Sequence, residues 1–468
     1  MRGTIIRLIC VAIVIAATPV AAQDNPWLER RVLNIAHRGG RAEAPEHTLY
    51  AYKVALPKLV ATLEVDVQRT LDGVLVVHHD DTVDRVTNGS GSVSAMTLAE
   101  LKELDNAYWY APICGGRCTG QPPEEYVFRG MATGATPPPP GFTAGDFQIA
   151  TVREVLETFP DILLSIEIKG TAPDSIPAAE DLADLLREFG RASNVMIASF
   201  DDATTAAFKA RAPEIHTTPG VAEILSFASA PGPLPEHRAF QIPRMFSGLD
   251  VPPLIVGPAH DNDLAVYVFI DRSEETDAVY NELIDLGVDG IITDEPTALQ
   301  VVLEQRGVAF EQERPVPIKS GLVKSSPLIK VVSKGTFPLP IAPPASTANA
   351  LSVSNNGGNM TDDLTGGEWK VLGGGIAPKG YKYVNKSAPA GGACKLLLLK
   401  RNVIKTVCKG KGTIPDPGPP TMNDDVEVEL SLGIDRYCAV GTAPHQVESI
   451  GKIIKVKDQP APAVCPGP

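Results

Sequence analysis

Long apolar runs are scarce in this chain of 468 residues, and positive charge is scarce in its first two thirds. After the first 22 residues no segment reaches the run of about 20 apolar residues that crosses a bilayer. Residues 1–314 contain 24 basic and 45 acidic residues, whereas residues 315–468 contain 18 and 11. Sequence-independent nucleic-acid binding needs a basic surface, so we expect no nucleic-acid partner. The change of sign near residue 315 predicts a domain boundary.

The first 22 residues are typical of a secretory signal peptide. Two arginines precede the apolar stretch Ile9–Ala17, and the small residues Ala21 and Ala22 stand directly before Gln23. A membrane anchor is the alternative, but the apolar run is short for one. We therefore expect an exported protein, either periplasmic or secreted.

Cysteine is also scarce, with seven in the chain and one of them inside the signal peptide. The other six are an even number, which predicts disulfides in an exported protein. Cys394 and Cys408 flank two strand-like runs that turn at residues 401–402, so a hairpin would place them opposite each other. By elimination the remaining pairs are Cys438–Cys465 and Cys114–Cys118. A zinc site of four thiolates is the alternative, but its usual C-x-x-C spacing is absent.

Strand-like and helix-like runs alternate between residues 33 and 309. The expected strands are Leu33–His37, Thr62–Gln68, Val74–His78, Leu163–Lys169, Val195–Phe200, Glu214–Pro219, Leu264–Ile270 and Gly290–Thr293. The expected helices include Thr48–Leu59, Thr97–Leu104, Val152–Phe159, Ala178–Phe189, Ala203–Arg211 and Glu274–Leu286. This alternation predicts parallel pairing, and a (β/α)₈ TIM barrel over residues 23–310 fits its count and length. A doubly wound open sheet is the alternative, which the absence of a G-x-G-x-x-G turn disfavours.

Two regions depart from this alternation. Residues 105–147 contain Tyr108-Trp109-Tyr110, two cysteines and four consecutive prolines, and we expect an ordered flap over the barrel mouth. Residues 316–468 contain short strand-like runs separated by Gly- and Pro-rich turns, which predicts a smaller all-β domain. Its lysine-rich strands are compatible with binding anionic cell-surface material. A disulfide-linked module that adds stability or spacing is the alternative.

Polar side chains gather at the carboxyl ends of the expected barrel strands, where barrel enzymes carry their active sites. They occur as His37-Arg38, Glu64-x-Asp66, His78-His79-Asp80 and Glu167-x-Lys169. Three carboxylates suit a hard divalent cation, Ca²⁺ or Mg²⁺, better than zinc. Arg and Lys beside them suit an anionic substrate, and two histidines can share general acid and base work. The combination favours hydrolysis or transfer of a phosphate ester.

Longer segments extend these motifs in a fixed order along the chain. They are Ile35-Ala36-His37-Arg38-Gly39-Gly40, Ala44-Pro45-Glu46-His47-Thr48, Leu63-Glu64-Val65-Asp66-Val67, Thr70-Leu71-Asp72-Gly73-Val74, the run 79–89, Ile166-Glu167-Ile168-Lys169, Ser199-Phe200 and the run 287–294. In this order they closely resemble the glycerophosphodiester phosphodiesterase family over about residues 33–300. The residues after 314 resemble, more weakly, a β domain found in various exported bacterial proteins.

The resemblance implies a TIM barrel that uses a divalent metal to hydrolyse glycerophosphodiesters to glycerol 3-phosphate and an alcohol. It also implies that a cyclic phosphate forms first, when the 2-hydroxyl of glycerol attacks phosphorus. Residue by residue, it implies the catalytic pair His37 and His79, the metal ligands Glu64, Asp66 and Glu167, the phosphate contacts Arg38 and Lys169, and the supporting Glu46.

Two departures from the family pattern concern the substrate pocket. His47 stands where the family commonly has Asn, and Tyr267-Val268-Phe269-Ile270 replaces the usual Trp-Thr-Val-Asn. These changes leave the preferred headgroup open. One alternative is a lysophospholipase D, with an acyl chain received by the aromatic residues 108–110, Phe128 and Phe142 and with transient contact to a membrane or cell surface. Another is a non-catalytic cell-surface binding protein, against which the complete set of site residues argues.

Overall fold

The computed structural model describes residues 25–28, 32–58 and 60–310 and, beyond these, segments of the C-terminal part. Those segments are 312–315, 318–324, 328–334, 349–355, 358–364, 368–372, 380–385, 394–400, 403–409, 426–432, 435–441, 446–449, 453–459 and 461–462. The expected signal peptide (1–22) and Cys465 lie outside them, so both stay predictions. Within the described part, no helix combines the length and apolar character needed to cross a membrane.

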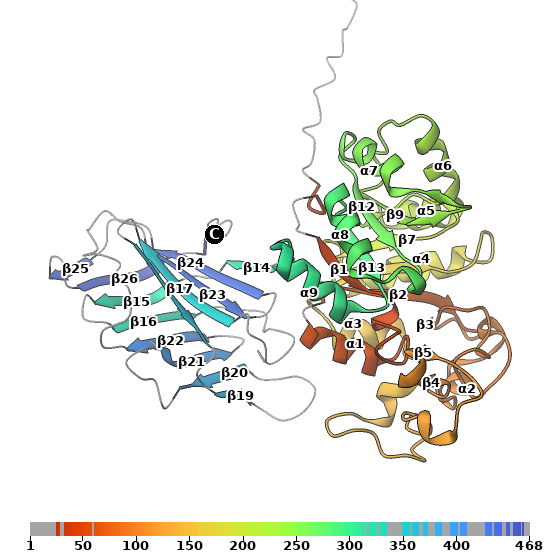
Figure 1. The fold of residues 1–468 in the computed structure, drawn as a ribbon, viewed down its shortest axis with the longest axis horizontal. Helices are drawn as coiled ribbons and strands as arrows, with labels where there is room; N and C mark the ends of the chain where they lie inside the picture. The colour runs from red at the N-terminus through yellow and green to blue at the C-terminus, as the bar shows by residue number, and fades with distance from the viewer. Residues whose placement is uncertain are drawn as a thin grey trace, which may run out of the picture.

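Eight parallel strands form the barrel (Figure 1). In spatial order they are β8 (His216–Thr217), β7 (Val195–Ala198), β6 (Leu163–Ile168), β2 (Thr62–Arg69), β1 (Leu33–Ala36), β13 (Gly290–Thr293), β12 (Ala265–Phe269) and β9 (Ala239–Pro243). The backbone N–H of Arg238 donates to the carbonyl of Thr217 at 3.0 Å, which links β9 back to β8. The predicted TIM barrel followed by an all-β region is thereby confirmed.

One of the eight expected strands is not a barrel strand, and one barrel strand was missed. The run at Val74–His78 forms β3 (Leu75–Val77), which pairs antiparallel with β2 outside the barrel order. Its place is taken by β9, a five-residue strand that begins shortly after the proline-rich residues 231–235 and itself ends in Pro243. Apolar alternation cannot separate a barrel strand from a hairpin partner, because both bury one face.

Most helices cover the outside of the barrel, whereas α2 follows β3 and is drawn apart from them (Figure 1). The helices are α1 (Leu49–Ala55), α2 (Leu98–Lys102), α3 (Val152–Thr158), α4 (Ile176–Glu188), α5 (Asp202–Arg211), α6 (Val221–Ser229), α7 (Pro252–His260), α8 (Asp277–Leu286) and α9 (Pro296–Arg306). The expected capping box opens α2, where the Thr97 side chain accepts from the N–H of Glu100 and Glu100 accepts from that of Thr97. Such a box satisfies N–H groups that the first helical turn leaves unpaired.

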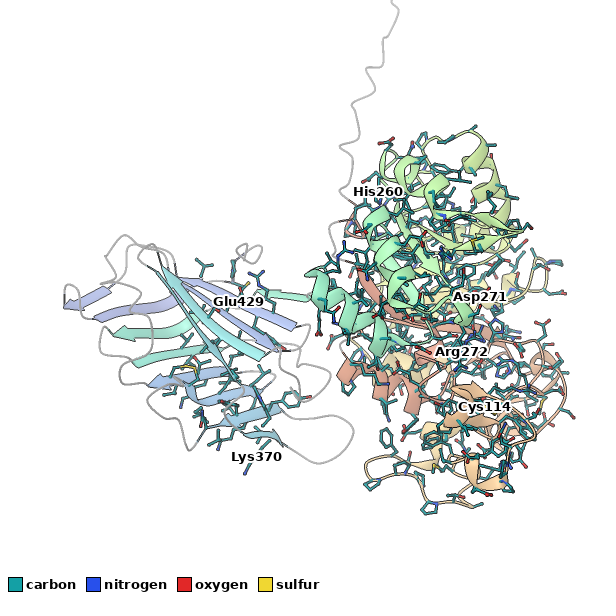
Figure 2. All side chains as sticks on the ribbon, in the orientation of Figure 1. Cys114, His260, Asp271, Arg272, Lys370 and Glu429 are labelled. Atoms are coloured by element: carbon teal, nitrogen blue, oxygen red, sulfur yellow. A yellow bond between two sulfur atoms is a disulfide. The ribbon has the colours of Figure 1, made fainter. Side chains whose placement is uncertain are left out.

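The segment 105–147 is ordered, but it lies beside the barrel mouth. It contains β4 (Tyr110–Ala111) and β5 (Gly116–Arg117), and a disulfide joins Cys114 to Cys118. A Cβ on Gly115 would lie 1.9 Å from Nη2 of Arg272, so this segment packs directly against the turn after β12. Figure 2 labels Cys114 and Arg272.

The aromatic residues of this segment stabilise the segment itself. Phe128 and Phe142 pack around Tyr50, with ring centroids 5.0 and 4.8 Å from its ring. The guanidinium of Arg129 lies 4.0 Å from the Tyr108 ring and 3.8 Å from the Tyr126 ring. These rings therefore have partners of their own, which leaves them poorly placed to receive an acyl chain.

In its described segments, the C-terminal module forms two sheets that share an apolar core. A five-stranded sheet has the order β14-β24-β23-β17-β18, and an eight-stranded sheet has the order β19-β20-β21-β22-β16-β15-β26-β25. Core side chains from both sheets include Leu351, Tyr381, Leu399 and Tyr437. The strands are β14 (Gln312–Pro315), β15 (Ile318–Lys324), β16 (Leu328–Lys334), β17 (Asn349–Asn355), β18 (Gly358–Asp363), β19 (Glu368–Leu372), β20 (Gly380–Val384), β21 (Cys394–Lys400), β22 (Val403–Lys409), β23 (Val426–Leu432), β24 (Asp435–Gly441), β25 (Gln446–Ser449) and β26 (Ile453–Gln459). Because β14 pairs with β24, this module starts a few residues before the predicted boundary at 316.

The module contains the expected hairpin disulfide. β21 pairs with β22, Cys394 lies opposite Cys408, and their sulfur atoms are bonded. Both side chains are in the core, 1% and 0% exposed. Cys438 is also disulfide-bonded, and its expected partner Cys465 lies outside the described residues.

Replacing both Cys394 and Cys408 by Ala should lower the free energy of unfolding of the C-terminal module by about 3 kcal/mol. A crosslink between residues 14 apart restricts the unfolded chain by roughly that amount. Urea unfolding followed by circular dichroism measures the change. The matched control is the double variant Cys114→Ala with Cys118→Ala, which removes a disulfide from the barrel instead. If both double variants shift the same urea-unfolding transition by the same amount, the Cys394–Cys408 disulfide does not specifically stabilise the C-terminal module.

Candidate active site

The turn after β1 brings the first pair of site residues to the carboxyl edge of the barrel. Arg38 has a left-handed backbone (φ 53°), and Gly39 and Gly40 follow with φ values of 86° and 83°. A Cβ on Gly39 would lie 2.9 Å from Cβ of Ala51, and one on Gly40 would lie 2.8 Å from Cγ of Pro296. Both glycines are therefore required by backbone conformation and by space. The turn aims the backbone N–H of Arg38 at Oε2 of Glu64, 2.8 Å away.

His37 is oriented by a carboxylate that follows β13, the strand next to β1. Its Nδ1 lies 2.6 Å from Oδ1 of Asp294, which follows β13 and is fully buried. The second oxygen of Asp294 accepts from Nε of Arg41 at 2.7 Å. Burial lowers the pKa of His37, and the bond to Asp294 opposes this shift. With Nδ1 held by Asp294, Nε2 is the nitrogen left for a substrate.

His79 has a similar arrangement on the opposite side. Its Nδ1 lies 2.6 Å from Oδ1 of Asp80, and Arg85 donates to both Asp80 and Glu46. Glu46 also accepts from Nη1 of Arg38 at 3.0 Å. Burial tends to raise the pKa of Glu46, but the bonds from Arg85 and the charge of Arg38 hold it well below its usual value. Through these charged hydrogen bonds Glu46 links the turn that carries His37 to the turn that carries His79.

Three carboxylates meet where β2 and β6 run side by side. Glu64 and Asp66 share one face of β2, because side chains alternate along a strand. Asp66 lies directly opposite Glu167 of β6 in the parallel register. All three residues are buried, at 2%, 1% and 8% exposure.

Two cations partly offset these charges. Lys169 donates to Oε1 of Glu167 at 2.6 Å and lies 3.5 Å from Oδ1 of Asp66, while Nε of Arg38 lies 3.4 Å from Oδ2 of Asp66. Burial and the charge of Asp66 still raise the pKa of Glu167 to about 7. They also raise the pKa of Glu64 well above its usual value. The cluster thus carries more negative charge than its own cations neutralise.

His47, at the position where the family commonly has Asn, lies behind Asp66. Its Nε2 lies 2.8 Å from Oδ2 of Asp66, and its Nδ1 lies 2.9 Å from the hydroxyl of Tyr52. Its backbone is left-handed (φ 56°), a conformation that Asn and His adopt more readily than most residues. Among the described residues, His47, Glu64 and Asp66 form a group whose candidate ligand atoms lie within 4.8 Å of one another.

The donor set fits a divalent cation. Glu64, Asp66 and Glu167 all line the cavity, whereas His47 does not. Oxygen ligands of this kind suit Ca²⁺ or Mg²⁺. Burial is the main cause of the raised pKa values of Glu64 and Glu167, the charge of Asp66 adds to it, and a bound cation would offset both effects.

One cavity of about 370 Å³ opens at the barrel mouth among these groups. Its polar side holds both histidines, the three carboxylates, Arg38, Arg41 and Lys169. Its other side is largely apolar and is lined by Phe200, Pro219, Val221, Ile224, Pro243, Phe269 and Ile270. No residue of the segment 105–147, which the structure describes throughout, lines this cavity.

The structure therefore brings together all the residues expected from the sequence except Glu46, which lies behind Arg38. Sequence reasoning assigned no role to Asp294, Asp80, Arg85 or Arg41. Asp294 is 257 residues from His37, so no local spacing could join the two. The sequence signals for Asp294 were its place at the carboxyl end of an expected strand and in the run 287–294 of the family resemblance.

Comparison with known proteins identifies the barrel. Residues 37–298 match the model of the glycerophosphoryl diester phosphodiesterase family. The chain belongs to this family. YhdW of Bacillus subtilis, a candidate glycerophosphodiester phosphodiesterase, is 31% identical over 56% of this chain and 94% of its own length. The glycerophosphodiester phosphodiesterase of Caldanaerobacter subterraneus is 30% identical over 59% of this chain and all of its own.

Solved structures of similar proteins include the glycerophosphodiester phosphodiesterase of Agrobacterium tumefaciens. It is 24% identical, with a TM-score of 0.43, and the match covers 58% of this chain and 99% of that one. The family match and the curated relatives make this chain an enzyme that hydrolyses phosphoric diesters, a glycerophosphodiester phosphodiesterase. The C-terminal module from Gln312 onward lies outside the family match.

In this phosphodiesterase, Asp294→Asn should lower kcat by a factor on the order of 10² and leave KM nearly unchanged. The amide can donate to Nδ1 of His37, which would place the proton on the wrong ring nitrogen. Steady-state kinetics on glycerophosphocholine measures the effect. Asp285→Asn, an exposed carboxylate that pairs with Arg306 on the barrel surface, is the matched control. Equal kcat values for the two variants would show that Asp294 does not position His37.

Behind Asp294 lies a half-buried carboxylate, Glu275. It accepts from the N–H of Asp294 at 2.6 Å and from the hydroxyls of Thr293 and Tyr280. Burial raises the pKa of Glu275 to about 7 despite these bonds. The folded state therefore holds a proton that the unfolded state has released between about pH 4.5 and 7.

As a result, Glu275 should reduce the free energy of unfolding as the pH rises through that window. Glu275→Gln should remove this contribution, so the variant should lose less stability than the parent between pH 5 and pH 8. Chemical denaturation at both pH values measures the difference. Glu157→Gln, which changes an exposed carboxylate on α3, should keep the parental pH dependence. Parallel pH profiles for the parent and Glu275→Gln would contradict the expectation.

Proposed function

We propose that this phosphodiesterase hydrolyses glycerophosphodiesters to glycerol 3-phosphate and an alcohol, with a divalent cation and with His37 and His79 as the acid–base pair. The observation that supports this most directly is the joint presence of two imidazoles and three buried carboxylates around one cavity. Each imidazole has its Nδ1 on a carboxylate, so each offers Nε2 to the substrate.

Glu64, Asp66 and Glu167 would hold the cation, Ca²⁺ or Mg²⁺. When bound, it would supply positive charge that stabilises the phosphate oxygens as negative charge develops on them. Arg38 and Lys169, which line the same cavity, add fixed positive charge for the phosphate. His47 holds Asp66 from behind and keeps its carboxylate oriented.

The two histidines would divide the proton transfers between them. In the first step Nε2 of one imidazole takes the proton from the 2-hydroxyl of the glycerol moiety, whose oxygen bonds to phosphorus. The other imidazole protonates the departing alcohol. In the second step the roles reverse, because water opens the cyclic phosphate and must lose a proton. The substrate's own hydroxyl serves as nucleophile, so no Ser or Cys is needed.

The test uses the purified full chain with glycerophosphocholine and glycerophosphoethanolamine, with glycerol 3-phosphate as the readout. EDTA should abolish turnover, and added Ca²⁺ or Mg²⁺ should restore it. His37→Ala and His79→Ala should each lower kcat by about 10² to 10⁴. Activity that survives EDTA would overturn the role of the cation.

His260 offers a matched control for the histidine variants. Figure 2 labels His260. It lies on α7, its Nε2 lies 2.9 Å from Oδ2 of Asp289, and it is absent from the cavity lining. His260→Ala should keep the parental kcat. If His37→Ala behaves like His260→Ala, then His37 has no part in proton transfer. Failure of all variants and of the parent on both substrates would overturn the proposed reaction.

A further inference from the structure

One edge of the active-site cavity carries charged side chains that the proposed reaction does not bring into contact with the substrate. Arg41 follows β1 and Asp271 follows β12, and both side chains line the cavity. In the barrel order only β13 lies between these two strands, so both residues belong to the same edge of the mouth. Arg272, next to Asp271, is exposed to solvent. Figure 2 labels Asp271 and Arg272.

Arg41 is held in place at one end of its guanidinium group and is unpaired at the other. Its Nε donates to Oδ2 of the buried Asp294 at 2.7 Å, and the backbone N–H of Ala42 donates to the carbonyl of Asp294 at 3.2 Å. Among the described residues, no acceptor bonds to Nη1 or Nη2 of Arg41, whose side chain is 32% exposed. A guanidinium offers its donors in a fixed plane, so these two nitrogens are oriented for an anionic group in the cavity.

Asp271 has a carboxylate that the fold itself does not use. It occupies the N-cap position of the short 3₁₀ helix Arg272–Glu274, where an Asp side chain commonly accepts from the N–H groups of the first turn. Its carboxylate makes no such bond, and within the described barrel no other donor reaches it. Only its backbone carbonyl is used, by the N–H of Glu274 at 2.8 Å. The negative charge of Asp271 therefore faces the cavity without a partner.

The segment 105–147 holds Arg272 beside the turn that carries Arg41. A Cβ on Gly116 of β5 would lie 3.2 Å from the carbonyl oxygen of Arg41 and 3.4 Å from Nη1 of Arg272. The disulfide between Cys114 and Cys118 closes the loop that contains Gly116. In the described part of the chain no carboxylate pairs with Arg272. Two guanidinium groups and one carboxylate thus occupy this edge, and they do not pair with one another.

Unlike charges that line one cavity edge without pairing suit a ligand that carries both charges. Guanidinium groups bind a carboxylate through paired N–H donors, and a carboxylate binds an ammonium group. A ligand with only a positive charge would meet Asp271 but would also face two guanidinium groups. A ligand with only a negative charge would face the carboxylate of Asp271. An α-amino acid group has its carboxylate and its ammonium on the same carbon atom, so it satisfies both kinds of residue at once.

We propose that Arg41, Asp271 and Arg272 form a subsite for a zwitterionic headgroup, so that the preferred diester has an α-amino-β-hydroxy acid as its alcohol, as in glycerophosphoserine. The inference rests on the proposed function, because the phosphate has to lie beside the carboxylate cluster and the histidines. From there the alcohol extends past His37, which shares Asp294 with Arg41. Its carboxylate meets the two guanidinium groups and its ammonium meets Asp271.

Four diesters of glycerol phosphate separate the two charges of the headgroup. Glycerophosphoserine carries both charges, glycerophosphoethanolamine carries the ammonium, the ester of 3-hydroxypropionate carries the carboxylate, and glycerophosphoglycerol carries neither. The experiment measures kcat/KM of the full chain with added Ca²⁺ or Mg²⁺. Glycerophosphoserine should exceed glycerophosphoglycerol about tenfold, because two exposed charge contacts should each contribute a factor of about three to five.

Single variants assign each charge of the headgroup to a residue. Arg272→Gln should lower, about threefold, the ratio of kcat/KM between each carboxylate-bearing diester and its counterpart without the carboxylate. Asp271→Asn should lower the corresponding ratio for the ammonium group by a similar factor. Arg272→Lys keeps the charge and should recover part of the preference. Each ratio is taken within one preparation, so partial unfolding of a variant does not mimic the effect.

The exposed ion pair between Asp184 and Arg211, on the outer surface of the barrel, supplies matched controls. Asp184→Asn and Arg211→Gln remove the same charges far from the cavity lining, and both should keep the parental ratios. Ratios that change equally in these controls and in the subsite variants would contradict the inference.

The substrate series also separates failure of the inference from failure of the proposed function. Equal kcat/KM for all four diesters in the parent would overturn the inference alone, because the phosphodiesterase reaction would remain. A higher kcat/KM for glycerophosphocholine than for glycerophosphoserine would also overturn it, since a quaternary ammonium group would then be the preferred ligand of this edge. Absence of turnover on every diester would overturn the proposed function, and the inference with it.

Discussion

Three carboxylates that are almost excluded from water meet at one point, because β2 and β6 run parallel with Asp66 directly opposite Glu167. Bringing such charges together is unfavourable unless cations or protons compensate for them. Much of the surrounding site supplies that compensation. The guanidinium of Arg38 and the ammonium of Lys169 both approach Asp66.

The same constraint accounts for the unusual backbone of the first turn. Arg38 adopts a left-handed conformation and points its N–H at Glu64, and the two glycines that follow have no room for a Cβ. The remaining imbalance of charge is what makes the cluster suited to a divalent cation. The arrangement that is costly for folding is therefore the arrangement that would bind the metal.

The barrel connects this cluster to the two histidines through rigid elements. β1 and β13 are neighbours, and this pairing places Asp294 beside His37 although the two are far apart in sequence. Glu275 in turn holds the backbone of Asp294. On the other side of the mouth the cavity is apolar and its edge is exposed. The active site therefore has one charged side and one apolar side.

The sequence by itself determined the barrel class and most of the site. Strand–helix alternation and long ordered motifs sufficed for that, because residues at strand ends converge wherever parallel strands close into a barrel. The sequence failed at β3, because the partner strand of a hairpin has the same apolar alternation as a barrel strand. It also failed at β9, because a short strand beside prolines has no clear alternation. It also placed the aromatic residues of 105–147 over the mouth, whereas they pack on Tyr50 and Arg129.

Tertiary structure alone decided which side chains act together across the chain. The bond from His37 to Asp294, the place of His47 behind Asp66 and the apolar side of the cavity all depend on strand order and loop position. None of these has a local pattern, because each joins residues on separate elements through packing. The sequence determined which chemical groups are present, and the closed barrel decided which of them share one cavity.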